Sequence, residues 1–234
     1  MGTPEFAVTS LAGLADAGFK IAGVITAPDK AAGRGLQIRE SAVKKYAKEK
    51  GLLILQPEKL KDPVFIAQLR SLNADLQVVV AFRMLPEVVW NMPALGTINL
   101  HGSLLPQYRG AAPINWAIIN GEKETGVTTF KLQQEIDTGN ILLSEKILIG
   151  NNETAGELHD RMKETGAALL VKTVKQLIEG KLVEQLQSKG SDGDRQTTVK
   201  HAPKIYTETC KINWDNGVQE IYNLIRGLSP YPGA

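Results

Sequence analysis

The chain has 234 residues, of which 43% are hydrophobic and 22% are charged, the balance of a globular protein with material for one large domain and part of another. Its net charge of +2 is too small to indicate, by itself, a protein that binds polyanions. No apolar run approaches the roughly 20 residues of a membrane span, the start lacks a secretory signal pattern, and the single cysteine, Cys210, excludes an internal disulfide. We therefore expect a soluble, cytoplasmic protein, and we expect a monomer.

The first expected element is a helix at the amino end, in MGTPEFAV (1–8), with Thr3 as its cap and Pro4 as its first residue. Strand and helix patterns then alternate. The run LQVVVAF (76–82) is apolar throughout, which is typical of a strand buried on both faces of a parallel sheet. This alternation predicts an α/β fold with a doubly wound, mostly parallel sheet. The expected strands span residues 19–26, 52–56, 76–82 and 97–101, and the expected helices span 41–51, 62–72 and 112–120.

The pattern changes in the second half of the chain. Two strands, 126–132 and 141–149, flank a polar turn and predict an antiparallel pair. TAGE (154–157) is a capping box, and it begins a helix that should end at Gly180. A last helix is expected at 215–227.

The two ends of the chain suggest that it is a fragment. In an alternating fold a strand should precede the first helix, and the chain stops just after LSPYPGA (228–234) begins a new element. Residues 188–204 are polar and poor in apolar side chains, as in a linker. We therefore expect a large domain at 1–187 that lacks its first strand, a linker at 188–204, and a truncated second domain at 205–234.

The strand TINLH (97–101) carries two polar residues on one face, Asn99 and His101, because side chains two apart on a strand share a face. The opposite face is already apolar, and the carboxyl ends of parallel strands are where α/β folds build their sites. The polar face and the position at the strand end together favour a site at the end of this strand. The alternative is that His101 is a strand-end histidine whose ring is hydrogen-bonded by the backbone.

Other candidate chemistry is weaker. IDTG (136–139) contains the Asp-Thr-Gly triplet of aspartic proteases, but those need two such carboxylates, and Asp137 alone could simply close a hairpin as an Asx-turn. The three histidines and one cysteine show no metal-ligand spacing, so we expect no metal. GRG (33–35) falls short of the G-x-G-x-x-G of dinucleotide-binding folds. Residues 28–50 carry seven basic and three acidic side chains, so the positive charge is concentrated there.

At this point the sequence resembles a known family. NLHGSLLPQYRGAAPINWAIINGEKETGVT (99–128), followed by IDTG, is similar to the folate-dependent formyltransferases. MGTPEFAV, APDKAAGRG (27–35) and KINWDNGVQEIYNLIRGLSPYP (211–232) narrow the resemblance to the branch that acts on methionyl-tRNA. The likeness runs almost continuously from residue 1 to about 185.

The resemblance implies that the large domain is catalytic and that its reaction moves a formyl group from 10-formyltetrahydrofolate to the α-amino group of methionyl initiator tRNA. It implies Asn99, His101 and Asp137 as the catalytic residues. Asn99 and His101 would donate hydrogen bonds to the oxyanion, and Asp137 would orient the ring and assist proton transfer. It also implies folate binding by the loop of Ser103, Leu104, Leu105 and Pro106, and a tRNA contact at Arg34.

The sequence departs from the family pattern in two places. One is Ala31, in the basic segment 28–50, and the other is AFRML (81–85), near the expected pterin pocket. Two alternatives stay open. One is a formyltransferase that acts on a purine ribonucleotide or an amino-sugar nucleotide, and the other is a folate- or RNA-binding module without turnover.

Overall fold

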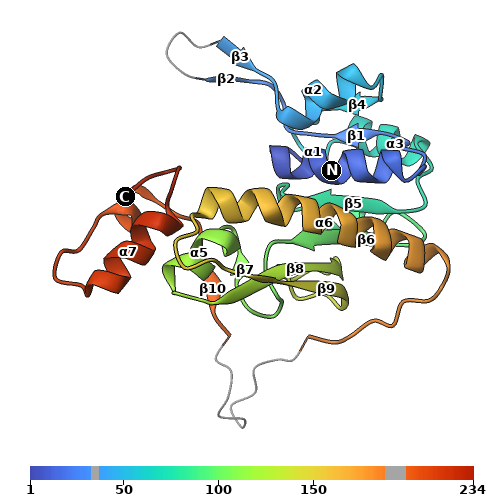
Figure 1. Ribbon diagram of the computed structural model, residues 1–234. Helices are drawn as coiled ribbons and strands as arrows, with labels where there is room; N and C mark the ends of the chain where they lie inside the picture. The colour runs from blue at the N-terminus through green and yellow to red at the C-terminus, as the bar shows by residue number, and fades with distance from the viewer. Residues whose placement is uncertain (33–36, 188–198) are drawn as a thin grey trace. The chain divides into compact units, whose positions relative to one another are not determined.

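The computed structural model describes residues 1–32, 37–187 and 199–234 (Figure 1). The chain divides into two compact units, Met1–Leu100 and His101–Ala234. These units do not coincide with the domains expected at 1–187 and 205–234, which stay a prediction. Within the described residues, no helix is long and apolar enough to cross a membrane.

The first unit alternates short strands with helices, as the sequence pattern predicts. β1 pairs in parallel with β4, and β5 pairs in parallel with β6, so the α/β class is confirmed. β2 and β3 form a separate antiparallel pair. The elements of the first unit are α1 (Glu5–Asp16), β1 (Val24–Ile25), β2 (Lys30–Ala32), β3 (Gln37–Arg39), α2 (Ala42–Glu49), β4 (Ile54–Leu55), α3 (Pro63–Ser71), β5 (Gln77–Val80), α4 (Glu87–Trp90) and β6 (Thr97–His101). The last residue of β6 opens the second unit.

Two of the expected strands are much shorter than the apolar runs that predict them. The runs 19–26 and 52–56 form only two-residue strands, Val24–Ile25 and Ile54–Leu55. Pairing continues only to the bond from the Thr26 amide to the Leu55 carbonyl, and Pro57 follows with no amide hydrogen to extend it. The number of paired residues in a strand therefore depends on its partner strand as well as on the length of its own apolar run.

The helix starts expected near residues 41 and 62 are confirmed, and the cap expected at Thr3 is wrong. Ser41 caps α2 by accepting the Lys44 amide at 3.0 Å, and Asp62 caps α3. Thr3 does not cap α1, because the helix begins at Glu5 with Pro4 as an extended N-cap. Gly2 is held in a parallel bridge with Val80 of β5, so Thr3 must carry the chain from that edge to the helix.

The second unit is built on an antiparallel strand pair covered by a long helix. β8 and β9 pair antiparallel, as predicted, and α6 lies along both of them (Figure 1). The capping box of Thr154 and Glu157 is confirmed at the start of α6. Leu158, Met162 and Leu170 on the inner face of α6 are fully buried. The elements are β7 (Arg109–Gly110), α5 (Pro113–Ile119), β8 (Glu124–Lys131), β9 (Ile141–Leu148), α6 (Ala155–Ile178), β10 (His201–Ala202), a 3₁₀ helix (Thr207–Cys210) and α7 (Val218–Gly227).

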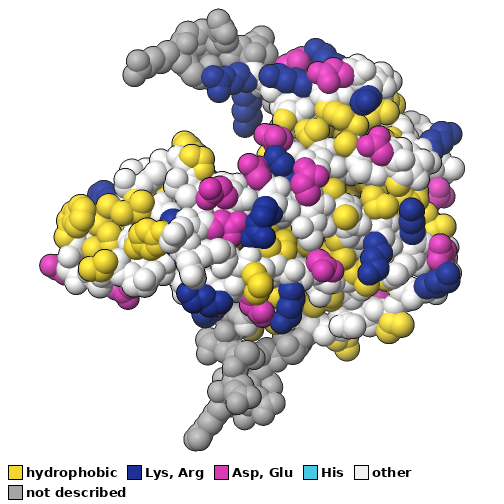
Figure 2. All heavy atoms as spheres, in the orientation of Figure 1, with side chains coloured by type: hydrophobic (Ala, Val, Ile, Leu, Met, Phe, Trp, Pro, Cys, Tyr) yellow, Lys and Arg dark blue, Asp and Glu magenta, His cyan; other side chains and the backbone are white. Residues whose placement is uncertain are grey.

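The end of the segment expected to be a linker belongs to the fold of this unit. β10 pairs in parallel with β7, with His201 beside Arg109 and Ala202 beside Gly110. Beyond it, α7 packs against α5, where the Asn115 side chain donates to the Gly227 carbonyl at 2.7 Å. Figure 2 shows hydrophobic side chains gathered on the surface over α7 and its flanking turns. The exposed large apolar residues there are Trp214, Val218, Tyr222, Ile225 and Tyr231.

Candidate active site

β6 carries both polar residues that the sequence singles out. Asn99 is half-buried, and His101, the last residue of the strand, has 8% of its surface exposed. The chain then turns at Gly102 into a loop that returns at β7. His101 is therefore fixed at a strand end, the position at which the sequence predicts a site.

The ring of His101 is oriented by the backbone of Tyr108. His101 Nε2 lies 2.9 Å from the Tyr108 carbonyl oxygen. Because a carbonyl oxygen can only accept, Nε2 carries a hydrogen and donates it. The edge of the ring also meets Phe130 of β8, with ring centroids 6.5 Å apart and planes at 83°. Nδ1 is thereby left to face Asp137, whose Oδ2 lies 3.8 Å away.

Tyr108 is itself held by residues that are distant in the sequence. Its backbone is in the left-handed region at φ 59°, and its amide donates to the Lys200 carbonyl at 2.7 Å. Its hydroxyl donates to Glu122, which also accepts the Lys200 ammonium at 2.6 Å. Burial and the bond to Glu122 raise the pKa of Tyr108 above its ordinary value. The carbonyl that orients His101 is therefore clamped by the segment just before β10.

Burial by itself raises the pKa of Glu122, but the hydrogen bonds from Lys200 and Tyr108 outweigh burial, so its net pKa is lowered. Glu122 is thus an ionised acceptor that serves both neighbours.

Asp137 lies in the turn between β8 and β9, where its backbone is left-handed at φ 54°. Its Oδ2 accepts the Gly110 amide hydrogen at 3.0 Å, a contact to β7. The local bond that closes the turn comes instead from the Thr138 hydroxyl to the Glu135 carbonyl, at 3.1 Å. The Asx-turn alternative for Asp137 is therefore not the arrangement observed, because its carboxylate reaches across to another strand.

The loop expected to bind folate, 103–106, is fastened to β8. Thr128 donates to the Ser103 carbonyl at 2.6 Å and accepts the Leu105 amide at 3.2 Å. The side chains of Ser103 and Leu105 are buried, whereas Leu104 and Pro106 are partly exposed. A ligand on this loop can therefore meet the side chains of Leu104 and Pro106, while Ser103 and Leu105 support the turn from within.

Two further expectations concern the first unit. Arg34, the expected tRNA contact, lies outside the described residues. The stretch AFRML (81–85) is the second place where the sequence departs from the family pattern. There, Arg83 donates to the carbonyls of Pro57 and Glu58, and Ala81 has a left-handed φ of 47°. Arg83 therefore ties this stretch to the segment after β4.

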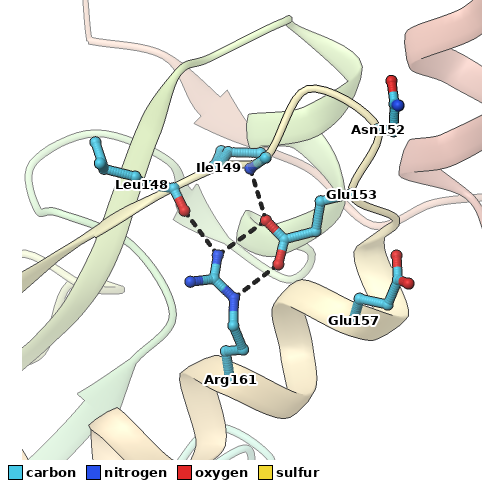
Figure 3. Close-up of a pocket in the computed structure, with 7 residues that line it drawn as sticks. Leu148, Ile149, Asn152, Glu153, Glu157 and Arg161 are labelled. Atoms are coloured by element: carbon cyan, nitrogen blue, oxygen red, sulfur yellow. Dashed lines mark hydrogen bonds and ion pairs between the residues drawn. The ribbon is translucent and has the colours of Figure 1, made fainter.

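A separate pocket lies at the turn between β9 and α6, and Figure 3 shows the side chains of Arg161 and Glu153 facing one another there. Arg161 donates to both carboxylate oxygens of Glu153, at 2.7 and 2.9 Å, and to the Leu148 carbonyl at 2.7 Å. These bonds pair Arg161 with Glu153, and Glu157 is engaged separately by Thr154 in the capping box, which fits a cluster that anchors the start of α6. The pocket is lined by Leu148, Ile149, Gly150, Asn152, Glu153, Glu157 and Arg161, and so contains none of the predicted site residues.

The structure shows three supporting residues that sequence reasoning missed: Tyr108, Lys200 and Gln187. The Gln187 side chain donates a hydrogen bond to the Asp137 carbonyl at 2.9 Å. Tyr108 stands inside the motif 99–128, but nothing local indicates that its carbonyl would hold the histidine. Lys200 and Gln187 lie 93 and 50 residues from their respective partners Gln107 and Asp137, so only the folded chain reveals them.

Comparison with known proteins decides the family. The formyl transferase family model matches residues 1–174, and the model of the formyl transferase C-terminal domain matches residues 204–234. The chain belongs to the formyl transferase family. Two curated relatives are named methionyl-tRNA formyltransferase. The one from Azobacteroides pseudotrichonymphae is 56% identical over 100% of this chain and 72% of its own length, and the one from Bacteroides fragilis is 54% identical over 100% and 71%.

Solved structures extend the likeness to the fold. A sugar 3N-formyl transferase, solved in the presence of dTDP and 5-N-formyl-THF, aligns with a TM-score of 0.71 and 23% identity over 97% of this chain and 76% of its own. The Rossmann-like α/β fold expected from the strand-helix alternation is thus the formyl transferase fold.

Proposed function

We propose that this formyl transferase moves the formyl group of 10-formyltetrahydrofolate to the α-amino group of methionyl initiator tRNA. The acceptor is supported by the names of relatives that are 53–56% identical over the whole chain. The observation that carries the chemistry is the approach of His101 Nδ1 to Asp137 Oδ2, at 3.8 Å, at the end of β6.

In the proposed reaction the acceptor amine is the nucleophile, so no serine or cysteine has to attack. A free α-amino group has a pKa of about 7.7–8.0, so a modest base suffices to keep it unprotonated. Its lone pair attacks the formyl carbon, a new C–N bond forms, and the carbonyl oxygen becomes an oxyanion. The tetrahedral intermediate then collapses, the bond to folate N10 breaks, and N10 takes up a proton.

In this mechanism His101 accepts the amine proton at Nδ1. The Nε2 hydrogen is already donated to Tyr108, so Nδ1 is the nitrogen that is free to act. The Asp137 carboxylate stabilises the imidazolium that forms, and the ring then returns the proton to the leaving nitrogen. This differs from the sequence interpretation, in which His101 donates a hydrogen bond to the oxyanion. Here the neutral ring has no second hydrogen, and the Asn99 amide is the neutral donor to the oxyanion.

We place the folate against the loop 103–106, with contacts from Leu104, Pro106 and the backbone. Support comes from the two hydrogen bonds between this loop and Thr128 and from the burial of the Ser103 and Leu105 side chains. A rigid loop holds the formyl carbon in a fixed place relative to His101, which lowers the entropic part of the barrier. Arg34 remains the proposed contact to the acceptor end of the tRNA.

A panel of acceptors tests the proposal. With 10-formyltetrahydrofolate as donor, methionyl initiator tRNA, an amino-sugar nucleotide and a purine ribonucleotide amine are offered in parallel, and formylated product is quantified. We expect turnover with the charged tRNA alone. Turnover with a small nucleotide instead would overturn the acceptor assignment, and folate binding without turnover on any acceptor would favour a binding module.

A further inference from the structure

The side-chain amide of Gln187 bridges the two segments that hold Asp137. Its Nε2 donates to the carbonyls of Asp137 and Gly139, at 2.9 and 2.7 Å. Its Oε1 accepts from Arg109 Nε at 3.1 Å and from Nη2 of the same guanidinium. All the hydrogens of this amide, and both acceptor positions of its oxygen, are therefore used.

These bonds fix the backbone on both sides of the Asp137 carboxylate. Gly110, the neighbour of Arg109, donates its amide hydrogen to Asp137 Oδ2 at 3.0 Å. Gln187 thus links the Asp137 carbonyl to Arg109 of β7, and the next residue of β7, Gly110, holds the Asp137 side chain. A left-handed aspartate at φ 54° is a sparsely populated conformation that persists only where its surroundings enforce it. Gln187 and Gly110 provide that enforcement.

We propose that Gln187 is a positioning residue for Asp137: it holds the turn 137–139 so that the carboxylate stays beside His101 Nδ1. The inference rests on the role given to Asp137 in the proposed function. Gln187 touches no reacting atom in this account and acts only through Asp137. A small displacement of a carboxylate that must stabilise a transient imidazolium slows the chemical step more than it weakens binding.

The competing explanation is that Gln187 only fastens the segment after α6 to the neighbouring strands, through its contact with Arg109 of β7. Gln185 has such a role, because its backbone exchanges hydrogen bonds with Ile141 at 2.8 and 2.9 Å. The two explanations differ for Gln187→Glu. A glutamate keeps the contact to Arg109, and so keeps the fastening, but its oxygens cannot donate to the carbonyls of Asp137 and Gly139.

The experiment measures kcat and KM for formyl transfer to methionyl initiator tRNA in Gln187→Ala, Gln187→Glu and a control, Gln185→Ala. The control removes an exposed amide from the same segment and leaves the backbone pairing intact. We expect kcat to fall roughly 10- to 100-fold in both Gln187 variants with KM for either substrate within about twofold. The control should match the wild type. Thermal unfolding is recorded for every variant, and if Gln187→Ala does not fold, Gln187→Glu decides.

A double-mutant cycle with Asp137→Asn shows whether Gln187 works through Asp137. If it does, adding Gln187→Glu to Asp137→Asn causes little further loss, because the group it positions is already gone. Equal losses on both backgrounds would overturn the inference, as would a normal kcat in Gln187→Glu while Asp137→Asn is slow. If Asp137→Asn itself turns over normally, the role of Asp137 in the proposed function fails, and the inference fails with it.

Discussion

His101 donates its Nε2 hydrogen to the carbonyl oxygen of Tyr108 at 2.9 Å. The bond determines the chemistry available to the ring, because it leaves Nδ1 unprotonated in the neutral state and turned toward Asp137. A histidine bonded to the backbone was the alternative to a functional one. Here the backbone bond selects the tautomer that a catalytic base at Nδ1 requires.

The tautomer of His101 can be measured directly. In a long-range ¹H–¹⁵N correlation spectrum at a pH where the ring is neutral, we expect the His101 Nε2 to be protonated and Nδ1 to be bare. The exposed His201 serves as the reference ring. A neutral His101 with its hydrogen on Nδ1 would contradict the assignment of Nδ1 as the proton acceptor.

Gly139 should tolerate no side chain. A Cβ at this position would lie 1.6 Å from the Lys131 carbonyl oxygen, so the turn that carries Asp137 would have to move. We expect Gly139→Ala to lower the free energy of unfolding by about 2–3 kcal/mol and to lower formyl transfer more than folate affinity.

The control is Gly180→Ala, at a glycine after α6 with φ +65° and open space around it. It should cost only about 1 kcal/mol for the left-handed backbone, and its activity should be normal. Equal activity in the two variants would mean that the turn does not position the carboxylate.

Stability should depend on pH through Glu122 and Lys200. The net pKa of Glu122 is lowered in the folded protein from an ordinary value of 4.5, so its contribution to stability is full above that pH and is lost as the pH falls through the folded value. Lys200→Met should therefore cost roughly 1 kcal/mol at neutral pH, and the cost should be smaller at an acidic pH below 4.5. Denaturant unfolding at both pH values measures the difference, with the exposed Lys211→Met as control. A cost that does not change with pH would rule out the ion pair as its source.

Arg34 lies outside the described residues, and its prediction rests on the sequence. Arg34→Ala should weaken turnover on charged tRNA and leave folate affinity unchanged, and Arg34→Lys should recover part of the loss, because lysine lacks the bidentate geometry. The salt dependence of RNA binding should decrease by roughly one phosphate contact. Normal kinetics with charged tRNA in Arg34→Ala would remove this residue from the acceptor site.

Local patterns predict the elements around the site well. The strand 97–101, the antiparallel pair and the capping box at Thr154 are each specified by neighbours in the sequence. The cap at Thr3 is wrong because a long-range bridge at Gly2 decides where the helix begins. The two-residue strands β1 and β4 are likewise limited by their partner. Local propensity therefore predicts which element forms, while distant contacts decide where it ends.

In the candidate site, too, local sequence patterns predict some of the residues and the folded chain brings in the others. Asn99 and His101 follow from alternation along a strand and from the position of the strand end. The approach of Asp137, and the support from Tyr108, Lys200 and Gln187, come from segments that meet only after folding. The residues that orient the proposed catalytic groups carry no motif of their own, because a glutamine amide or a backbone carbonyl can hold a neighbouring group in many sequence contexts.

The most direct test of the proposed reaction is single-turnover transfer from 10-formyltetrahydrofolate to methionyl initiator tRNA, measured for the wild type, Asn99→Ala and Asp137→Ala. We expect the wild type to formylate the charged tRNA. Each variant should slow the transfer by roughly 10²- to 10⁴-fold, because each loses an oxyanion donor or the partner of a general base. Folate affinity should be unchanged. Near-normal transfer in either variant would contradict the role given to that residue, and no transfer by the wild type would contradict the proposed reaction.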